Sequence, residues 1–186
     1  MDRGMIRAFI AIELSADIRA KLSSVSGELS GRGVTCVAQD NIHITLLFLG
    51  DVREQTLEAI KERLGKIRAK SFDISIEGIG AFGHKGPEVV FACVGDGLAE
   101  IKAIYSDIAH SISDLGFAAE EREFTPHATI ARVRSGSAAE KAREFATAHG
   151  KDRFGVFTCS SIALKSSAIG EGVPKYTTLY SLELAP

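Results

Sequence analysis

Hydrophobic and polar residues alternate along this chain with two periods, one typical of strands and one typical of helices. Segments with the two periods alternate from one end of the chain to the other. Apolar residues at every second position predict a strand, whereas apolar residues three and four apart predict one face of a helix. Strands are predicted at residues 7–14, 34–37, 42–49, 72–79, 89–94, 127–133, 154–164 and 177–184. Helices are predicted along the apolar stripes that begin at Ile18, Leu57, Leu98 and Ala138. Ser15 and Asp96 are candidate N-caps, and Gly116 is placed to end the third helix.

The order of elements repeats in the second half of the chain. Matching positions are separated by 82 for Phe9 and Phe91, 83 for Ile18 and Ile101, 84 for His43 and His127, and 82 for Phe72 and Phe154. Element order alone can repeat by chance, but a nearly constant offset together with a shared motif is harder to obtain that way. We therefore predict one bilobal domain over residues 1–186, with duplicate units at 7–80 and 88–164 and a last strand at 177–184.

The candidate chemistry is a short motif that both halves carry. Residues 43–46 read His-Ile-Thr-Leu and residues 127–130 read His-Ala-Thr-Ile. Because a strand alternates faces, each copy presents an imidazole and a hydroxyl on the same face. One copy is weak evidence, since a buried histidine often only satisfies a backbone carbonyl, but two copies in facing lobes predict one site for acid–base chemistry on a phosphate ester. His84, His110 and His149 are predicted to be surface or structural residues.

Composition and charge argue against several classes of function for this chain. The chain has 22 Lys and Arg against 24 Asp and Glu, a formal net charge of −2. This balance argues against wrapping a long nucleic acid, although a few local cations can still recognise an RNA end. The cysteines (Cys36, Cys93 and Cys159) are far apart in strand-like runs, which is typical of buried thiols in a reducing compartment. Without metal-ligand spacing or an apolar stretch of transmembrane length, we expect a cytoplasmic protein that works without metal or cofactor.

Four segments of the chain resemble one known family. They read RAFIAI at residues 7–12, NIHITLLFLG at 41–50, FTPHATIAR at 124–132, and LKSS followed by GVPKY within 164–176. Over essentially its whole length the chain is similar to the LigT-like branch of the two-histidine phosphoesterase superfamily. This branch contains the RNA 2′,3′-cyclic phosphodiesterases formerly called 2′-5′ RNA ligases. The chain departs from the family at one place. Members of the family often carry a tryptophan shortly before the first motif, whereas this chain reads Thr-Cys-Val at residues 35–37 and contains no tryptophan.

The resemblance implies an α+β fold of two pseudo-symmetric lobes. Each lobe would be an antiparallel sheet with helices outside, and the two histidine strands would face a central cleft. It also implies metal-independent hydrolysis of RNA 2′,3′-cyclic phosphate ends to 2′-phosphomonoesters, with no cofactor. Carried over by position, the site residues are His43 as proton donor, His127 as proton acceptor, and Thr45, Thr129 and Arg132 as substrate-binding groups. Tyr176 joins the substrate-binding candidates on the residues alone, as a ring in a loop that contains glycine and proline.

The residues themselves leave several points open. The two motif copies are too alike to decide which histidine is the acid. The same pair could join a cyclic phosphate to a 5′-hydroxyl as a 2′-5′ RNA ligase, although water at high concentration favours hydrolysis. We expect a monomer that acts on RNA with a cyclic phosphate end, tRNA fragments among the candidates, and not on membranes. The alternatives are a small-nucleotide cyclic phosphodiesterase and a non-catalytic module that binds RNA ends.

Strand alternation also makes predictions for neighbouring residues. Arg132, five residues after His127, should point away from the histidine face unless the strand is bulged or twisted. Phe48 stands in the same relation to His43 and is therefore expected in the core, which leaves Tyr176 as the better candidate for stacking on a base. Arg7, Lys165 and Lys175 are other cations that could attract a phosphate, but each is expected to be an ordinary surface charge.

Overall fold

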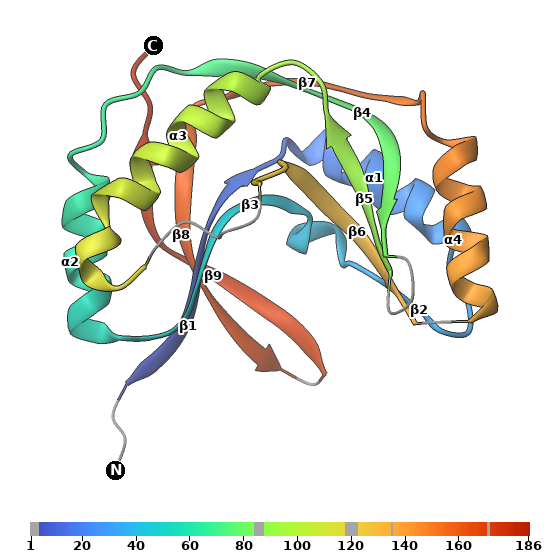
Figure 1. The fold of residues 1–186 in the computed structure, drawn as a ribbon, viewed down its shortest axis with the longest axis horizontal. Helices are drawn as coiled ribbons and strands as arrows, with labels where there is room; N and C mark the ends of the chain where they lie inside the picture. Colours follow the sequence, from blue (N-terminus) through green and yellow to red (C-terminus); the bar gives the residue numbers. More distant parts are fainter. Residues whose placement is uncertain (1–3, 84–87, 118–122, 135, 171) are drawn as a thin grey trace.

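The computed structural model describes residues 4–83, 88–117, 123–134, 136–170 and 172–186, which form a sheet flanked by helices (Figure 1). The strands are β1 (Met5–Glu13), β2 (Val34–Cys36), β3 (His43–Arg53), β4 (Phe72–Phe82), β5 (Glu88–Val94), β6 (His127–Val133), β7 (Arg153–Cys159), β8 (Ser161–Gly170) and β9 (Val173–Glu183). The helices are α1 (Ala16–Glu28), α2 (Glu54–Leu64), α3 (Leu98–Ser111) and α4 (Ser137–Ala148), with 3₁₀ turns at Gln39–Asn41 and Ser113–Leu115. Among the described residues, no helix is both long and apolar enough to cross a membrane.

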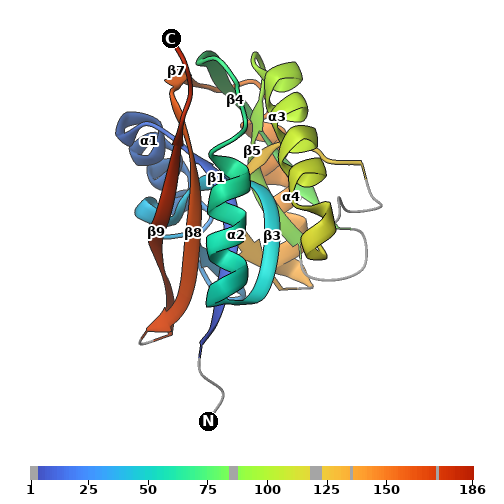
Figure 2. The same ribbon diagram turned by 90° about the vertical axis from the view of Figure 1, so that its left-hand side faces the viewer.

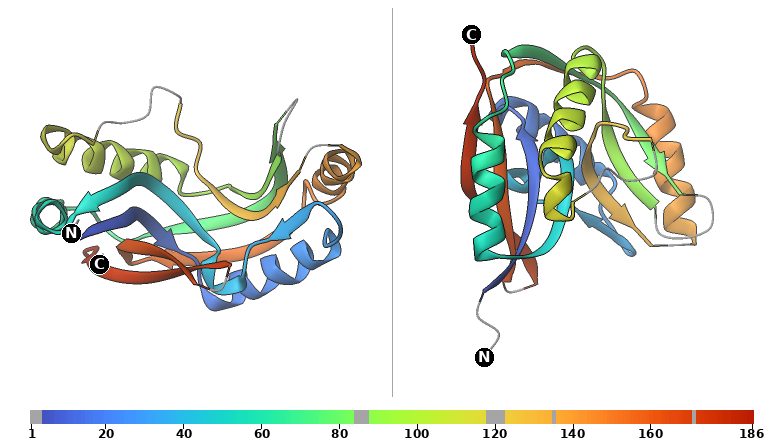
Figure 3. Two further views of the ribbon diagram at one scale, coloured as in Figure 1. Left: turned by 90° about the horizontal axis from the view of Figure 1, so that it is seen from below. Right: turned by 60° about the vertical axis from the view of Figure 1, so that its left-hand side comes forward.

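The strands pair in the order β7-β4-β5-β6-β3-β1-β8-β9, with β2 added to β6, and the pairings between these strands are antiparallel. The order is symmetric about the contact between β3 and β6. On one side follow β1, β8 and β9, and on the other side follow β5, β4 and β7. Because β4 pairs with β5 and β8 pairs with β1, strands from the two halves of the sequence interlock in one curled sheet (Figure 3).

The helices pack across the two halves as well. α1 contacts β6 and β7, whereas α3 contacts β3, and α4 packs on β4 and β5. Figure 1 has α2 and α3 at one side and α1 and α4 at the other, and Figure 2 turns β8, β9 and α2 toward the viewer. α1 buries Ile18, Leu22 and Val25, and each such side chain stabilises the fold by about 1.5–3 kcal/mol when it leaves water.

One of the three predicted helix boundaries is confirmed. The hydroxyl oxygen of Ser15 accepts the backbone N–H of Ile18 at 3.4 Å and caps α1. Gly116 does not end α3, which ends at Ser111; in the left-handed region, at φ +91°, it ends the 3₁₀ turn that follows the helix. Asp96 does not cap α3 either, because Gly97 precedes that helix at φ +87° and no side chain caps it.

The predicted class, mixed α and β structure with antiparallel strands, is confirmed, but several strand boundaries are wrong. β4 extends beyond the predicted 72–79 to Phe82, and β9 begins at Val173, before the predicted 177–184. The single strand predicted at 154–164 is two strands separated at Ser160, because β7 pairs with β4 whereas β8 pairs with β1. Gly50 and Asp51 do not end β3, which continues to Arg53 because both residues stay paired with β1.

A β-bulge lies at the same place in both histidine strands. β3 pairs Thr45 with Ala11 but Leu47 with Ile10, so Leu46 is an extra residue. β6 pairs Thr129 with Phe91 but Ala131 with Val90, so Ile130 is the extra residue there. The first seven residues of the two strands share one burial pattern, in which two adjacent residues are buried. Each bulge shifts the strand by one residue and turns the side chains beyond it to the opposite face.

Candidate active site

The two histidine motifs lie side by side where β3 meets β6. Ile44 and Ala128, the second residues of the two motifs, pair directly in antiparallel register. The same register sets each histidine opposite the threonine of the other copy. Side chains opposite each other on one face lie about 5 Å apart and diagonal ones about 7–8 Å apart. Both imidazoles and both hydroxyls therefore gather on one patch of the sheet.

A backbone carbonyl orients each imidazole in the same way. Nδ1 of His43 donates to the carbonyl oxygen of Asn41 at 2.7 Å, and Nδ1 of His127 donates to that of Thr125 at 2.8 Å. A carbonyl can only accept, so Nδ1 carries the hydrogen in both rings and Nε2 is the atom left for chemistry. Nε2 of His43 accepts the hydroxyl of Thr45 at 3.0 Å.

Aromatic rings pack against both imidazoles. Phe9 stacks on His43 with ring centroids 4.9 Å apart and an interplanar angle of 25°. Phe91 meets His127 edge-on at 5.1 Å, and Phe82 meets it edge-on at 5.4 Å. These rings cover part of each imidazole and restrict how it can turn.

The ribbon of β8 and β9 closes the His43 side of the patch. Tyr176 lies edge-on against Phe9 at 4.9 Å and against His43 at 5.4 Å. Nδ2 of Asn41 donates to the carbonyl oxygen of Pro174 at 2.7 Å. The residue whose carbonyl orients His43 therefore also holds this ribbon in place, and Tyr176 lines the patch as a wall.

An ion pair lies next to His43. Glu13 is opposite His43 in the register of β1 and β3, and the ammonium of Lys165 on β8 donates to its carboxylate. Burial lowers the pKa of His43 to about 4; the carbonyl of Asn41 raises it, Lys165 lowers it and Glu13 raises it. His43 is therefore neutral in the free protein at neutral pH. The prediction of a surface charge was wrong for Lys165, which is buried because β8 is an inner strand, whereas Lys175 is exposed as predicted.

The bulges decide the neighbours of the histidines. Phe48 is not in the core as predicted, because the bulge in β3 turns it onto the face of His43. There it is 64% exposed, with its ring 6.4 Å from that of Phe9. The bulge in β6 likewise turns Arg132 onto the face of His127, where it is exposed. Arg132 therefore has the orientation that a substrate contact requires, and its role stays a prediction.

Sequence reasoning missed five residues that surround the histidines: Phe9, Glu13, Phe82, Phe91 and Lys165. In the sequence, Phe9 and Phe91 serve only as markers of the repeat. Strand alternation from Phe9 would have placed Glu13 on the same face. No sequence signal pairs Lys165 with Glu13, because the two are 152 residues apart.

The other histidines lie elsewhere. His110 is exposed on α3. His149 follows α4, and its Nδ1 lies 2.7 Å from the carboxylate of Asp152. His84 lies outside the described residues. For His110 and His149 the surroundings fit the surface and structural roles predicted.

The cysteines are free thiols in β2, β5 and β7. Cys159 is buried, and burial raises its pKa to about 11. Cys93 is half-buried opposite His127, and burial raises its pKa too. A raised pKa keeps a thiol protonated at neutral pH, which suits packing better than nucleophilic attack.

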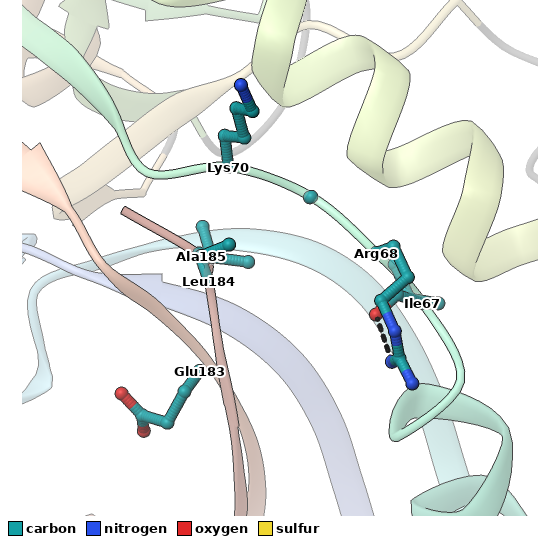
Figure 4. Close-up of a pocket in the computed structure, with 7 residues that line it drawn as sticks. Ile67, Arg68, Lys70, Glu183, Leu184 and Ala185 are labelled. Atoms are coloured by element: carbon teal, nitrogen blue, oxygen red, sulfur yellow. Dashed lines mark hydrogen bonds between the residues drawn. The ribbon is translucent and has the colours of Figure 1, made fainter.

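The hollow in Figure 4, of about 600 Å³, is a separate feature. It is lined by residues 67–70 and 183–185, where the end of the chain meets the segment after α2. Lys70 and Ala185 form an isolated parallel bridge there, and Lys70 points away from Glu183 (Figure 4). The lining contains neither histidine motif, so the hollow is assigned no part in the chemistry.

Comparison with known proteins gives the family. The family model of the 2′-5′ RNA ligase superfamily matches residues 13–168. The chain belongs to this superfamily. A relative from Aeropyrum pernix named RNA 2′,3′-cyclic phosphodiesterase is 35% identical over 157 residues, which are 84% of this chain and 89% of the relative. A relative of the same name from Archaeoglobus fulgidus is 33% identical over 180 residues, which are 96% of this chain and 100% of the relative.

Solved structures confirm the fold of this superfamily member. Escherichia coli LigT in complex with 3′-AMP superposes with a TM-score of 0.82 at 23% identity, covering 98% of this chain and 99% of LigT. A Thermus thermophilus protein superposes with a TM-score of 0.77 at 25% identity, covering 96% of this chain and 97% of the other. The resemblance inferred from the motifs is thus confirmed at the level of family and fold.

Proposed function

We propose that this protein is an RNA 2′,3′-cyclic phosphodiesterase that hydrolyses the cyclic end by paired-histidine acid–base catalysis. One observation carries the proposal: the direct pairing of Ile44 with Ala128, which joins two histidine motifs into one patch. Each imidazole keeps Nε2 for chemistry because Nδ1 is bound to a carbonyl. The relatives from A. pernix and A. fulgidus, named for this activity and matched over most of their length, support it.

The reaction needs one proton removed and one supplied. Nε2 of His127 takes a proton from water as the water oxygen attacks phosphorus on the side opposite the 3′-oxygen. The bond from phosphorus to the 3′-oxygen breaks, and Nε2 of His43 gives its proton to that oxygen. The product is a 2′-phosphomonoester with a free 3′-hydroxyl. The hydroxyls of Thr45 and Thr129 donate to the non-bridging oxygens, where charge builds up.

To act as the proton donor, His43 has to take up a proton from solvent when the substrate binds. Burial lowers the pKa of His43 to about 4, so its Nε2 is free of protons before binding and accepts the Thr45 hydroxyl instead. An anionic phosphate at the patch favours the imidazolium, because opposite charges attract strongly where water is excluded. We expect the Thr45 hydroxyl to turn to the phosphate as His43 takes up its proton.

The surroundings of His43 fit a nucleoside next to the phosphate. The exposed ring of Phe48 offers a face on which the base can stack, beside the wall formed by Tyr176. Arg132 brings a cation to the His127 side, where it can attract the phosphate or the RNA backbone. The same acid–base pair can run in reverse with a 5′-hydroxyl as nucleophile, which gives a 2′-5′ linkage.

The test is the loss of a cyclic phosphate end without metal. The protein is incubated in excess EDTA with a short RNA that ends in a 2′,3′-cyclic phosphate, beside the His43→Ala, His127→Ala and His110→Ala variants. We expect turnover by the wild type and by His110→Ala, and a fall of about 100- to 10,000-fold in each motif variant. The product should resist a 3′-specific phosphatase. An intact cyclic end with the wild type would overturn the proposal.

Two alternatives have their own readouts. A small-nucleotide phosphodiesterase would show no gain in turnover beyond one nucleotide in a length series of cyclic-phosphate oligonucleotides. A non-catalytic module would bind the RNA end, and His127→Ala would have no wild-type turnover to lose. The expectations of a duplicated bilobal domain, a cytoplasmic monomer and tRNA fragments among the substrates stay predictions.

A further inference from the structure

A second aromatic surface lies beside His127. Phe82 stacks on Phe91 with ring centroids 4.1 Å apart and an interplanar angle of 19°, and both rings meet His127 edge-on. Phe91 is 7% exposed and is a packing residue. Phe82 is 45% exposed, although a phenylalanine ring gains free energy when it leaves water. The structure thus keeps a large apolar ring accessible next to one of the two imidazoles.

The geometry of the proposed reaction divides the patch into two sides. The attacking and departing oxygens lie on opposite sides of phosphorus. The nucleoside that carries the cyclic phosphate holds the departing 3′-oxygen, so it lies on the side of His43, where Phe48 is exposed. Whatever brings the attacking oxygen lies against His127, and therefore beside Phe82. Water needs no aromatic surface there, whereas a nucleoside with a 5′-hydroxyl brings a base that does.

We propose that Phe82 is the stacking surface for the base of a second nucleoside, whose 5′-oxygen enters or leaves beside His127. This inference rests on the proposed function and adds a subsite to it. In a 2′-5′-linked dinucleotide, the 3′-hydroxyl attacks phosphorus and gives its proton to His43. The bond from phosphorus to the 5′-oxygen breaks, and His127 gives its proton to that oxygen. The products are a 2′,3′-cyclic phosphate and a nucleoside with a 5′-hydroxyl, and the reverse reaction joins them.

The test compares two substrates that differ only by the second nucleoside. These are adenosine 2′,3′-cyclic phosphate and the 2′-5′-linked adenosine dinucleotide, and the readout is the ratio of their kcat/KM values. Stacking of one base contributes about 1–3 kcal/mol, which corresponds to a factor of about 5 to 150. Phe82→Ala should lower the ratio of dinucleotide to cyclic mononucleotide by a factor in this range. Phe82→Leu, which keeps apolar packing on Phe91, should lower it too.

Two further variants serve as controls. Phe48→Ala should lower both kcat/KM values and leave their ratio within twofold, because its ring serves the nucleoside that both substrates share. Val156→Ala, at a residue that is 64% exposed on β7, should change neither value.

Three results would overturn the subsite. The first is a ratio that does not change in Phe82→Ala. The second is an equal loss on both substrates in Phe82→Ala and Phe82→Leu, which would make Phe82 a support for His127. The third is a wild type that hydrolyses the cyclic phosphate but not the dinucleotide, which would leave the proposed function intact. Turnover of neither substrate would overturn the proposed function as well.

Discussion

Replacing His43 by glutamine should change how the stability of the fold depends on pH. Burial lowers the pKa of His43 from 6.5 to about 4. Between those two pH values the unfolded chain binds a proton at this residue while the folded chain does not, so the wild type loses stability as the pH falls. One pKa unit corresponds to about 1.36 kcal/mol, so the loss amounts to about 3 kcal/mol by pH 4. Above pH 6.5 the residue is neutral in both states and contributes no pH dependence.

The measurement is urea unfolding of both proteins at several pH values between about 7 and 4. Far-UV circular dichroism is the suitable signal, because the chain has no tryptophan. Other titrating groups are common to the wild type and His43→Gln, so only the difference between their free energies of unfolding is interpreted. We expect that difference to shift by about 3 kcal/mol in favour of the variant from pH 7 to pH 4.

The control is His110→Gln, a change at an exposed residue of α3, which should follow the wild type over the whole range. A constant difference between wild type and His43→Gln from pH 7 to pH 4 would refute the reasoning. It would mean that His43 takes up its proton as readily in the folded protein as in the unfolded chain. A bound phosphate would then not be needed to favour the protonated form of His43.

The ion pair and the threonines give two more predictions. Lys165→Met should raise the pKa of His43 and Glu13→Gln should lower it, because Lys165 and Glu13 act on that imidazole with opposite signs. An NMR titration of the histidine ring protons measures the pKa of His43 in both variants. A change of that pKa in the same direction in both would contradict the opposite effects of Lys165 and Glu13. Thr45→Val and Thr129→Val should each lower kcat by about 10- to 1,000-fold through loss of a hydrogen bond to the phosphate, while the serine variants keep most of it. Steady-state kinetics on a cyclic-phosphate RNA decides this, and a change confined to KM would count against it.

The sequence predicted the strands and the histidine faces because both depend on local patterns. It could not predict the bulges, because Leu46 and Ile130 are apolar residues with apolar neighbours, and no local sequence pattern distinguishes them as extra residues. A one-residue slip then decides whether Phe48 lies in the core or beside His43, and whether Arg132 can reach a substrate. The ion pair of Glu13 and Lys165 could not be predicted for another reason. It depends on the pairing of β1 with β8, which are far apart in the sequence.

The bulges also bear on how two similar motifs can take unequal roles. At equivalent register positions, Glu13 lies opposite His43 while Cys93 lies opposite His127. The fifth residue after each histidine is Phe48 in β3 and Arg132 in β6. One imidazole therefore stands beside a buried ion pair and an exposed ring, and the other stands beside a protonated thiol and an exposed cation. Acid–base catalysis needs one histidine to give a proton while the other takes one, and identical surroundings would not separate the two roles. The difference lies in the neighbours that the register brings to each motif, which is why the motifs alone could not assign the donor.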